Sequence, residues 1–150
     1  MQIIDFYESK SRERWLSHLR LCDWKGGKKL CELIDKDKFH KVFGENAHLL
    51  LLTDGTNVFS MCVVSDNDGK PDPKMSPWLG YVYTFPEHRG KHLLRHLFER
   101  AAELARKNGF GTIYLSTDLV GLYEKYGFQS AGVIRTEHGG YKRVYMKNTR

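Results

Sequence analysis

The chain has 150 residues, with 24 Lys and Arg against 18 Asp and Glu, a formal net charge of +6 and 41% hydrophobic residues. This composition excludes a disordered chain, and the length predicts one domain over residues 1–150. The apolar runs are far shorter than the roughly 20 residues that cross a bilayer. The cationic residues are spread along the sequence, which is typical of an ordinary basic surface rather than a nucleic-acid-binding one and suits a polyanionic ligand.

The cysteines and the first residues bear on the compartment. Cys22, Cys31 and Cys62 are odd in number and have no CxxC spacing, so we expect reduced thiols and no zinc cage. Residues 1–5 lack the basic and apolar regions of a secretory signal. The sequence therefore predicts a cytoplasmic protein with no membrane partner.

Hydrophobic periodicity predicts the elements of the N-terminal half. This half should contain a strand, two helices separated by a break at Gly26-Gly27, and a hairpin that precedes a Pro-containing loop. The expected ranges are a strand over 2–7, helices over 8–21 and 28–40, hairpin strands over 48–53 and 58–64 around a turn at 54–57, and a loop over 65–77.

The C-terminal half opens with a strand whose Gly80 indicates a local distortion, and a long helix with an apolar stripe follows. The expected ranges are a strand over 78–85, a helix over 89–108, a strand over 112–117, a short helix over 119–126 and a final hairpin over 129–135 and 141–147. A helix between two strands favours a parallel crossover at that point. We therefore expect an α+β fold with a mixed, mostly antiparallel sheet flanked by helices.

Two short stretches on either side of the long predicted helix carry most of the functional information. The first, residues 84–95, joins a strand to a basic glycine loop at a helix start, where backbone N–H groups can bind a phosphate. The second, residues 122–128, places Tyr123 four residues before Gly127-Phe128. Tyr123 follows Arg89 by 34 residues, a spacing that fits one long helix, one strand and one short helix.

These stretches resemble the two signatures of the GNAT-type N-acetyltransferase superfamily, and the order of elements is similar over about residues 46–136. The loop resembles the pattern Arg/Gln-x-x-Gly-x-Gly/Ala from Arg89, although His92 and Leu94 stand where small residues are usual. The ending resembles Tyr-x-x-x-Gly-Phe. The resemblance implies a β-α-β-α core that binds acetyl-CoA and an enzyme that transfers the acetyl group directly to a primary amine.

The resemblance also implies roles for individual residues. Tyr123 would protonate the departing CoA thiolate, since a phenol with a pKa of about 10 keeps its proton at neutral pH. Backbone groups of the preceding strand would pair with the pantetheine arm, and one N–H would polarise the thioester carbonyl. The cofactor-binding residues expected on this basis are Val82, Tyr83, Thr84, Arg89, Gly90, Lys91, His92, Leu93, Leu94, Arg95 and Ser116.

The general base that takes the amine proton is less well marked. Asp118, at a strand–helix junction, is the first candidate for this catalytic role, and Glu87 and His138 follow. A water relay without a single essential base is equally compatible with the sequence. The acceptor amine itself cannot be read from these residues, and the resemblance leaves a homodimer open.

Other functions compete with this interpretation. His88, His92 and His96 have metal-ligand spacing, but no neighbouring carboxylate or cysteine completes a set, so no metal site is predicted. A non-catalytic CoA-binding or nucleic-acid-binding module is the main alternative, because His92 and Leu94 depart from the family pattern.

Overall fold

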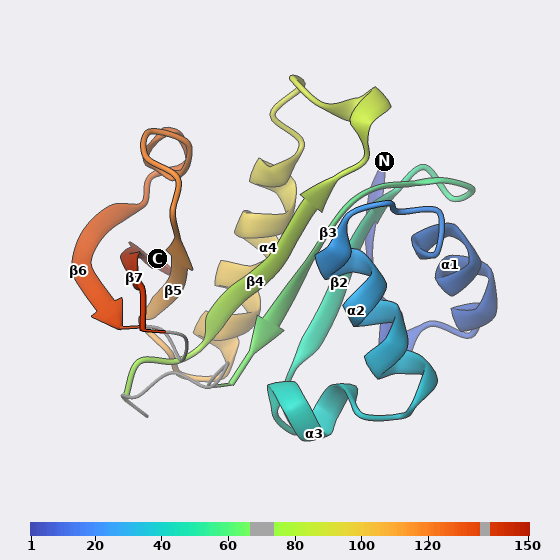
Figure 1. Cartoon of the computed structure of the whole chain (residues 1–150), viewed down its shortest axis with the longest axis horizontal. Helices are drawn as coiled ribbons and strands as arrows, with labels where there is room; N and C mark the ends of the chain where they lie inside the picture. The colour runs from blue at the N-terminus through green and yellow to red at the C-terminus, as the bar shows by residue number, and fades with distance from the viewer. Residues whose placement is uncertain (67–73, 136–138) are drawn as a thin grey trace.

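The computed structural model describes residues 1–66, 74–135 and 139–150, and within them seven strands form one sheet (Figure 1). The strand order is β1-β2-β3-β4-β5-β7-β6, and β4–β5 is the one parallel pair among these described strands. The predicted α+β fold, with its mostly antiparallel sheet and parallel crossover, is confirmed. The strands are β1 (Gln2–Asp5), β2 (His48–Thr53), β3 (Val58–Ser65), β4 (Trp78–Thr84), β5 (Thr112–Thr117), β6 (Gln129–Arg135) and β7 (Tyr141–Asn148).

Helices cover both faces of the sheet (Figure 1). On one face α1 (Arg12–Leu19), α2 (Lys25–Asp35) and α3 (Phe39–Phe43) share an apolar core with β2, β3 and β4. On the other face α4 (Leu94–Lys107) packs on a second core that includes Leu97, Phe98 and Tyr123. Three short 3-10 helices complete the described elements: η1 (Phe6–Glu8), η2 (Pro86–His88) and η3 (Tyr123–Tyr126).

The predicted helix break at Gly26-Gly27 is wrong, because both glycines lie in the first turn of α2. A Cβ on Gly26 would lie 2.3 Å from Cζ2 of Trp24, and a Cβ on Gly27 would lie 2.6 Å from the Cys22 Sγ. Glycine in a helix costs about 1 kcal/mol relative to alanine. Here the two glycines make room for neighbouring side chains instead of ending the helix, a tertiary requirement that local propensity does not reveal.

Two other predicted helices have different bounds. The helix expected over 8–21 begins at Arg12, because residues 6–8 form η1, which the Asp5 carboxylate caps by accepting the Tyr7 N–H at 3.2 Å. The helix expected over 28–40 is two helices, α2 and α3, separated at Asp37, whose φ is 55°. A residue in this left-handed region cannot continue a right-handed helix. The predicted loop over 65–77 falls largely on residues 67–73, outside the described residues.

A β-bulge distorts β4 beside Gly80, where the sequence indicates it. The β3–β4 register pairs Met61 with Tyr83 and Val63 with Gly80, so two β4 residues lie opposite the single Cys62. Tyr81 in this bulge has a φ of 49°, a conformation that is strained for a residue with a side chain. Bulges redirect side chains and commonly occur beside functional sites.

The two parallel strands are paired only at their beginnings. Their ladder joins Trp78 to Tyr114 and Leu79 to Leu115, and beyond these pairs β4 and β5 diverge (Figure 1). Since the strands separate, the C-terminal half of β4 has an edge that β5 does not cover. This arrangement places the bulge, and the residues that follow it, at the opening between the strands.

The long helix and the short helix of the predicted core also differ from expectation. The helix expected over 89–108 starts at Leu94, since Gly90 and His92 have φ values of 80° and 55° that no α-helix accommodates. The helix expected over 119–126 is reduced to η3, because Gly121 has a φ of 89°. The final hairpin is confirmed as β6 and β7, with β7 inserted between β5 and β6.

Candidate active site

A cavity of about 440 Å³ lies where β4 ends, between the loop that leads into α4 and the helix η3. We call it the basic cavity. It is lined by Val82, Tyr83, Thr84, His88, Arg89, Gly90, His92, Leu93, Leu94, Leu122, Lys125 and Tyr126. It therefore unites both of the sequence stretches that carry the functional prediction, although they are separated by a helix and a strand.

The charge of this lining is one-sided. Four basic side chains contribute to it, and among the described residues no carboxylate belongs to the lining. Two acidic residues of the same stretches lie elsewhere: Glu87 is outside the lining, and the Glu124 carboxylate accepts the Gly121 N–H at 3.1 Å. A cavity with positive side chains and no negative ones attracts a polyanion such as the phosphates of CoA. The donor groups present therefore fit that ligand.

The loop from Arg89 to Leu93 is held by its own contacts. The Arg89 Nε donates to the Thr84 carbonyl at 2.9 Å, and its guanidinium lies 5.4 Å from the centroid of the Tyr83 ring. Gly90 would have nothing within 4 Å of an added Cβ, so the loop leaves open space there. The loop ends at α4, which has no side-chain N-cap, and a helix start of this kind favours an anion.

His92, which stands where the family pattern has glycine, has a left-handed backbone that glycine adopts without strain. Its φ is 55°, in the left-handed region that costs a non-glycine residue about 1 kcal/mol. Its side chain lines the basic cavity. The departure from the pattern therefore adds an imidazole to the cavity lining, and Leu94 lines the cavity at the first residue of α4.

The two tyrosines of η3 have different surroundings. Tyr123 is buried and packs near Phe98 and Phe128, with ring centroids 6.0 and 6.1 Å away. Burial, and then the proximity of Cys62 and Tyr126, raises the pKa of Tyr123, which favours its protonated form. Tyr126 lies edge-on to Phe98 at 5.2 Å and lines the basic cavity, whereas Tyr123 does not belong to the lining.

The remaining predicted residues lie outside the lining. Lys91 and Arg95 are exposed, and Ser116 is half-buried on β5 opposite Val144 of β7. Asp118 is exposed just after β5. His138 lies outside the described residues.

Sequence reasoning missed the contributions of His88, Leu122, Lys125 and Tyr126 to the lining. All four lie within or beside the two quoted stretches. The basic or aromatic side chains of His88, Lys125 and Tyr126 could have drawn attention to them, whereas Leu122 carries no such signal. Their orientation toward the cavity depends on how η2 and η3 are placed, and residue spacing does not give that placement.

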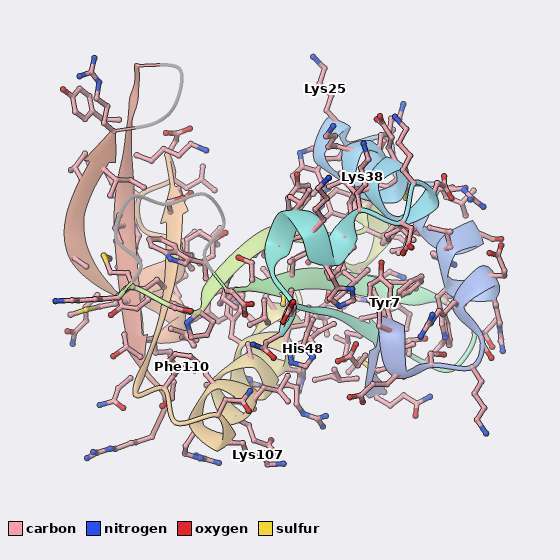
Figure 2. All side chains as sticks on the ribbon, turned by 90° about the horizontal axis from the view of Figure 1, so that it is seen from below. Tyr7, Lys25, Lys38, His48, Lys107 and Phe110 are labelled. Carbon is pink, nitrogen blue, oxygen red and sulfur yellow. The ribbon has the colours of Figure 1, made fainter. Side chains whose placement is uncertain are left out.

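A second cavity, of about 330 Å³, lies at the opposite end of β3, where β2 begins. We call it the acidic cavity; Tyr7 and His48, two of its residues, lie close to α3 (Figure 2). His48 Nδ1 is 2.6 Å from Asp5 Oδ2. The lining consists of Asp5, Tyr7, Glu8, His40, Glu45, Asn46, Ala47, His48 and Asn108.

No helix in the described part of the chain is long and apolar enough to cross a membrane. Among residues 1–66, 74–135 and 139–150, no group of three or more His, Cys, Asp and Glu side chains is arranged to hold a metal ion.

Comparison with known proteins gives a consistent result for the fold. Residues 11–128 match the sequence profile of the "Acetyltransferase (GNAT) family". No curated protein sequence matches the chain significantly. The similar solved structures described next are 15–17% identical to this chain, so they show a shared fold and do not show a shared acceptor.

Three solved structures are similar over nearly the whole chain. A GNAT-family acetyltransferase from Desulfovibrio desulfuricans has a TM-score of 0.72 at 16% identity, covering 99% of both chains. An aminoglycoside 6'-N-acetyltransferase complexed with coenzyme A has a TM-score of 0.70 at 15% identity, covering 100% of this chain and 98% of that one. A spermidine/spermine N-acetyltransferase from Vibrio cholerae has a TM-score of 0.65 at 17% identity, covering 99% and 92%.

Proposed function

The chain belongs to the GNAT acetyltransferase family, and from this premise we propose that it transfers the acetyl group of acetyl-CoA directly to a primary amine. The observation that carries the proposal is the basic cavity. Its four basic side chains, without a carboxylate in the lining, provide a binding surface for the phosphates of CoA at the end of β4. Acetyl-CoA is then the donor substrate.

We assign the phosphates to the loop and to the start of α4. Arg89 and Lys125 supply positive charge, His88 and His92 add imidazole groups that can donate hydrogen bonds, and the α4 start adds the partial positive charge of a helix N-terminus. Lys91 and Arg95 are exposed at the same loop and are proposed to contact the phosphates from outside the cavity. Gly90 leaves room for such a ligand, because nothing lies within 4 Å of an added Cβ.

The edge of β4 is proposed to hold the pantetheine arm. The β4–β5 ladder ends at Leu79 and Leu115, so backbone groups from Val82 to Thr84 have no partner strand in β5. An extended arm can pair with such an edge as an added strand would. A backbone N–H beside the bulge would then point toward the acetyl oxygen and stabilise negative charge on it. Ser116, on the facing strand β5, is proposed to contact the arm from the other side.

The reaction forms a C–N bond and breaks a C–S bond, so one proton must leave the amine and another must reach the thiolate sulfur. Tyr123 is our candidate for the second transfer, and its raised pKa supports the role because the hydroxyl stays protonated at neutral pH. Tyr126 competes for the role, since it lines the cavity. Asp118 is the proposed base, because it is exposed beside η3 and can exchange protons with water.

Binding and turnover test the proposal separately. Acetyl-CoA at a hundredfold excess over its dissociation constant should stabilise the protein by about 2.7 kcal/mol, observed as a higher melting temperature. Adding a panel of primary amines should then release free CoA and yield acetylated amine, both detected by mass spectrometry. Binding without release for any amine would favour the non-catalytic CoA-binding alternative, and the absence of a melting shift would refute the whole proposal.

A further inference from the structure

Trp24 is partly exposed and stacks on Tyr83, a β4 residue that belongs to the lining of the basic cavity and to the core under α1, α2 and α3. Its indole lies parallel to the Tyr83 ring, with centroids 5.3 Å apart and an interplanar angle of 3°, and 6.0 Å from the Tyr81 ring. Tyr83 lines the basic cavity, and Tyr81 lies in the β4 bulge. The Trp24 side chain nevertheless remains 37% exposed, so part of a well-positioned aromatic surface faces solvent.

The start of α2 is built to keep the indole in this position. Trp24 precedes the first residue of α2, and an added Cβ on Gly26 would lie 2.3–2.6 Å from three atoms of the indole. A side chain at position 26 would therefore push the indole away from Tyr83. The helix accepts an unfavourable glycine here, and the result is an exposed ring held in a single place.

The surroundings of Trp24 combine exposed apolar surface with charges of both signs, including the Arg89 guanidinium over the Tyr83 ring. Leu21, in the same connection between α1 and α2, is 73% exposed. The Arg20 charge is paired with Asp35 at 2.6 Å, and the Lys25 side chain extends away from the molecule (Figure 2). Asp23 is a single exposed carboxylate. Such a surface offers packing to a flat apolar group and little attraction to a substrate with several positive charges.

We propose that the acceptor is an arylalkylamine, a primary amine joined by a short alkyl chain to an aromatic ring, and that this ring packs on the exposed part of Trp24 beside Tyr83. Trp24 is thus a specificity-determining residue. The inference rests on the proposed acetyl transfer and adds the class of acceptor to it. Aromatic pairs prefer edge-to-face or offset contacts. One such contact should favour an aromatic amine over an amine without a ring by about twofold to tenfold.

The first experiment compares three amines with the unaltered protein and acetyl-CoA: 2-phenylethylamine, n-butylamine and spermidine. We expect kcat/KM to be highest for 2-phenylethylamine, by about tenfold over n-butylamine. Equal or better use of n-butylamine or spermidine would overturn the aromatic preference and leave acetyl transfer standing. If no amine is acetylated, the proposed function fails and this inference fails with it.

The second experiment changes Trp24 in two ways. Trp24→Ala should reduce the preference for 2-phenylethylamine over n-butylamine by about tenfold, and Trp24→Phe should keep most of it. Gly26→Ala should also reduce the preference, because it displaces the indole without removing it, although alanine favours the helix. The KM for acetyl-CoA should be little changed in all three. Gly26→Ala and Trp24→Phe keep the test decisive if Trp24→Ala fails to fold.

A matched control is Phe110→Ala. Phe110 is 41% exposed, similar to Trp24, but lies after the end of α4, far from the start of α2 (Figure 2). Its removal should leave the preference unchanged. An unchanged preference in both Trp24→Ala and Gly26→Ala would overturn the proposal, as would an equal loss in Phe110→Ala.

Discussion

The two ends of α4 lie beside cavities of opposite charge. Leu94, the first residue of the helix, lines the basic cavity, whereas Asn108, just after its last residue, lines the acidic cavity. Counting residues 1–66, 74–135 and 139–150, the basic cavity has four basic side chains and no carboxylate in its lining. On the same count the acidic cavity has three carboxylates and two histidines in its lining, and neither Lys nor Arg.

This difference shows that net charge does not locate a binding site. The chain has a net charge of +6, and its cationic residues are evenly spread in the sequence. Folding collects some of them around the N-terminus of α4, where the helix dipole is positive, and collects carboxylates near its C-terminal end. The basic cavity is the one with the family signatures and the uncovered edge of β4, so chemistry is expected there.

The largest expected effect concerns the two tyrosines of η3. If the Tyr123 hydroxyl protonates the thiolate, Tyr123→Phe should lower the turnover rate, with about 10²–10⁴-fold as the upper range. The affinity for acetyl-CoA should change little. Tyr126→Phe is the matched control with the same loss of one hydroxyl. Steady-state kinetics with an accepted amine measure both. If Tyr126→Phe shows the large loss and Tyr123→Phe does not, the cavity-facing tyrosine is the proton donor.

Charge reversal tests the contrast between the two ends of α4. Lys125→Glu replaces an attractive charge in the basic cavity with a repulsive one, and we expect acetyl-CoA to bind about tenfold more weakly. Lys107→Glu makes the same change of charge at the other end of α4 and should leave affinity unaltered. Isothermal titration at low and high salt measures both. Equal weakening by the two variants would mean that only net charge matters.

His92→Gly should separate backbone strain from ligand contact. Glycine adopts the φ of 55° without penalty, so the free energy of unfolding should rise by up to about 1 kcal/mol. Acetyl-CoA should at the same time bind a few times more weakly, because an imidazole is lost from the cavity lining. His96→Ala, at the third residue of α4 and outside the lining, is the control for affinity. Tighter binding by His92→Gly would show instead that the imidazole crowds the phosphates.

The smallest effect belongs to the acidic cavity and depends on pH. The hydrogen bond to Asp5 raises the pKa of His48 above its usual 6.5 against the opposing effect of burial, and the charges of Asp5, Glu8 and Asp66 add to it. His40, Glu45 and Tyr7 share the cavity. Since the protonated form is favoured in the folded state, the stabilisation is fully present below about pH 6.5 and is lost as pH rises through the raised pKa.

Denaturant unfolding of the native protein and of His48→Gln at pH 5.5 and 8.5 measures this effect. The variant should be less stable by about 1 kcal/mol at pH 5.5, and the difference should shrink at pH 8.5. Acetyl-CoA affinity should be the same in both proteins, since His48 is at the opposite end of β3 from the basic cavity. A difference that grows with pH would contradict the sign of the shift.

Strong local signals in the sequence were sufficient for much of the fold. The hairpin turn at 54–57 follows from residues that favour that conformation, and the crossover between β4 and β5 follows from a helix placed between two strands. The Gly26-Gly27 prediction failed, since these glycines accommodate the Trp24 indole and the Cys22 thiol. Likewise, nothing in the sequence signals the left-handed backbone of His92. The predicted helix therefore begins at residue 89, five residues before α4 begins at Leu94.

The sequence by itself determined the family, the order of elements and the two stretches that meet at the basic cavity, because motif spacing and hydrophobic periodicity are local properties of the chain. Only the tertiary structure decided that Tyr126 faces the cavity while Tyr123 is buried, that Lys125 joins Arg89 in the lining, and that Trp24 stacks on Tyr83. Those outcomes depend on the divergence of β4 from β5 and on how the helices pack across the two faces of the sheet. Residue spacing states which side chains share an element, whereas packing between distant elements sets which of them share a surface.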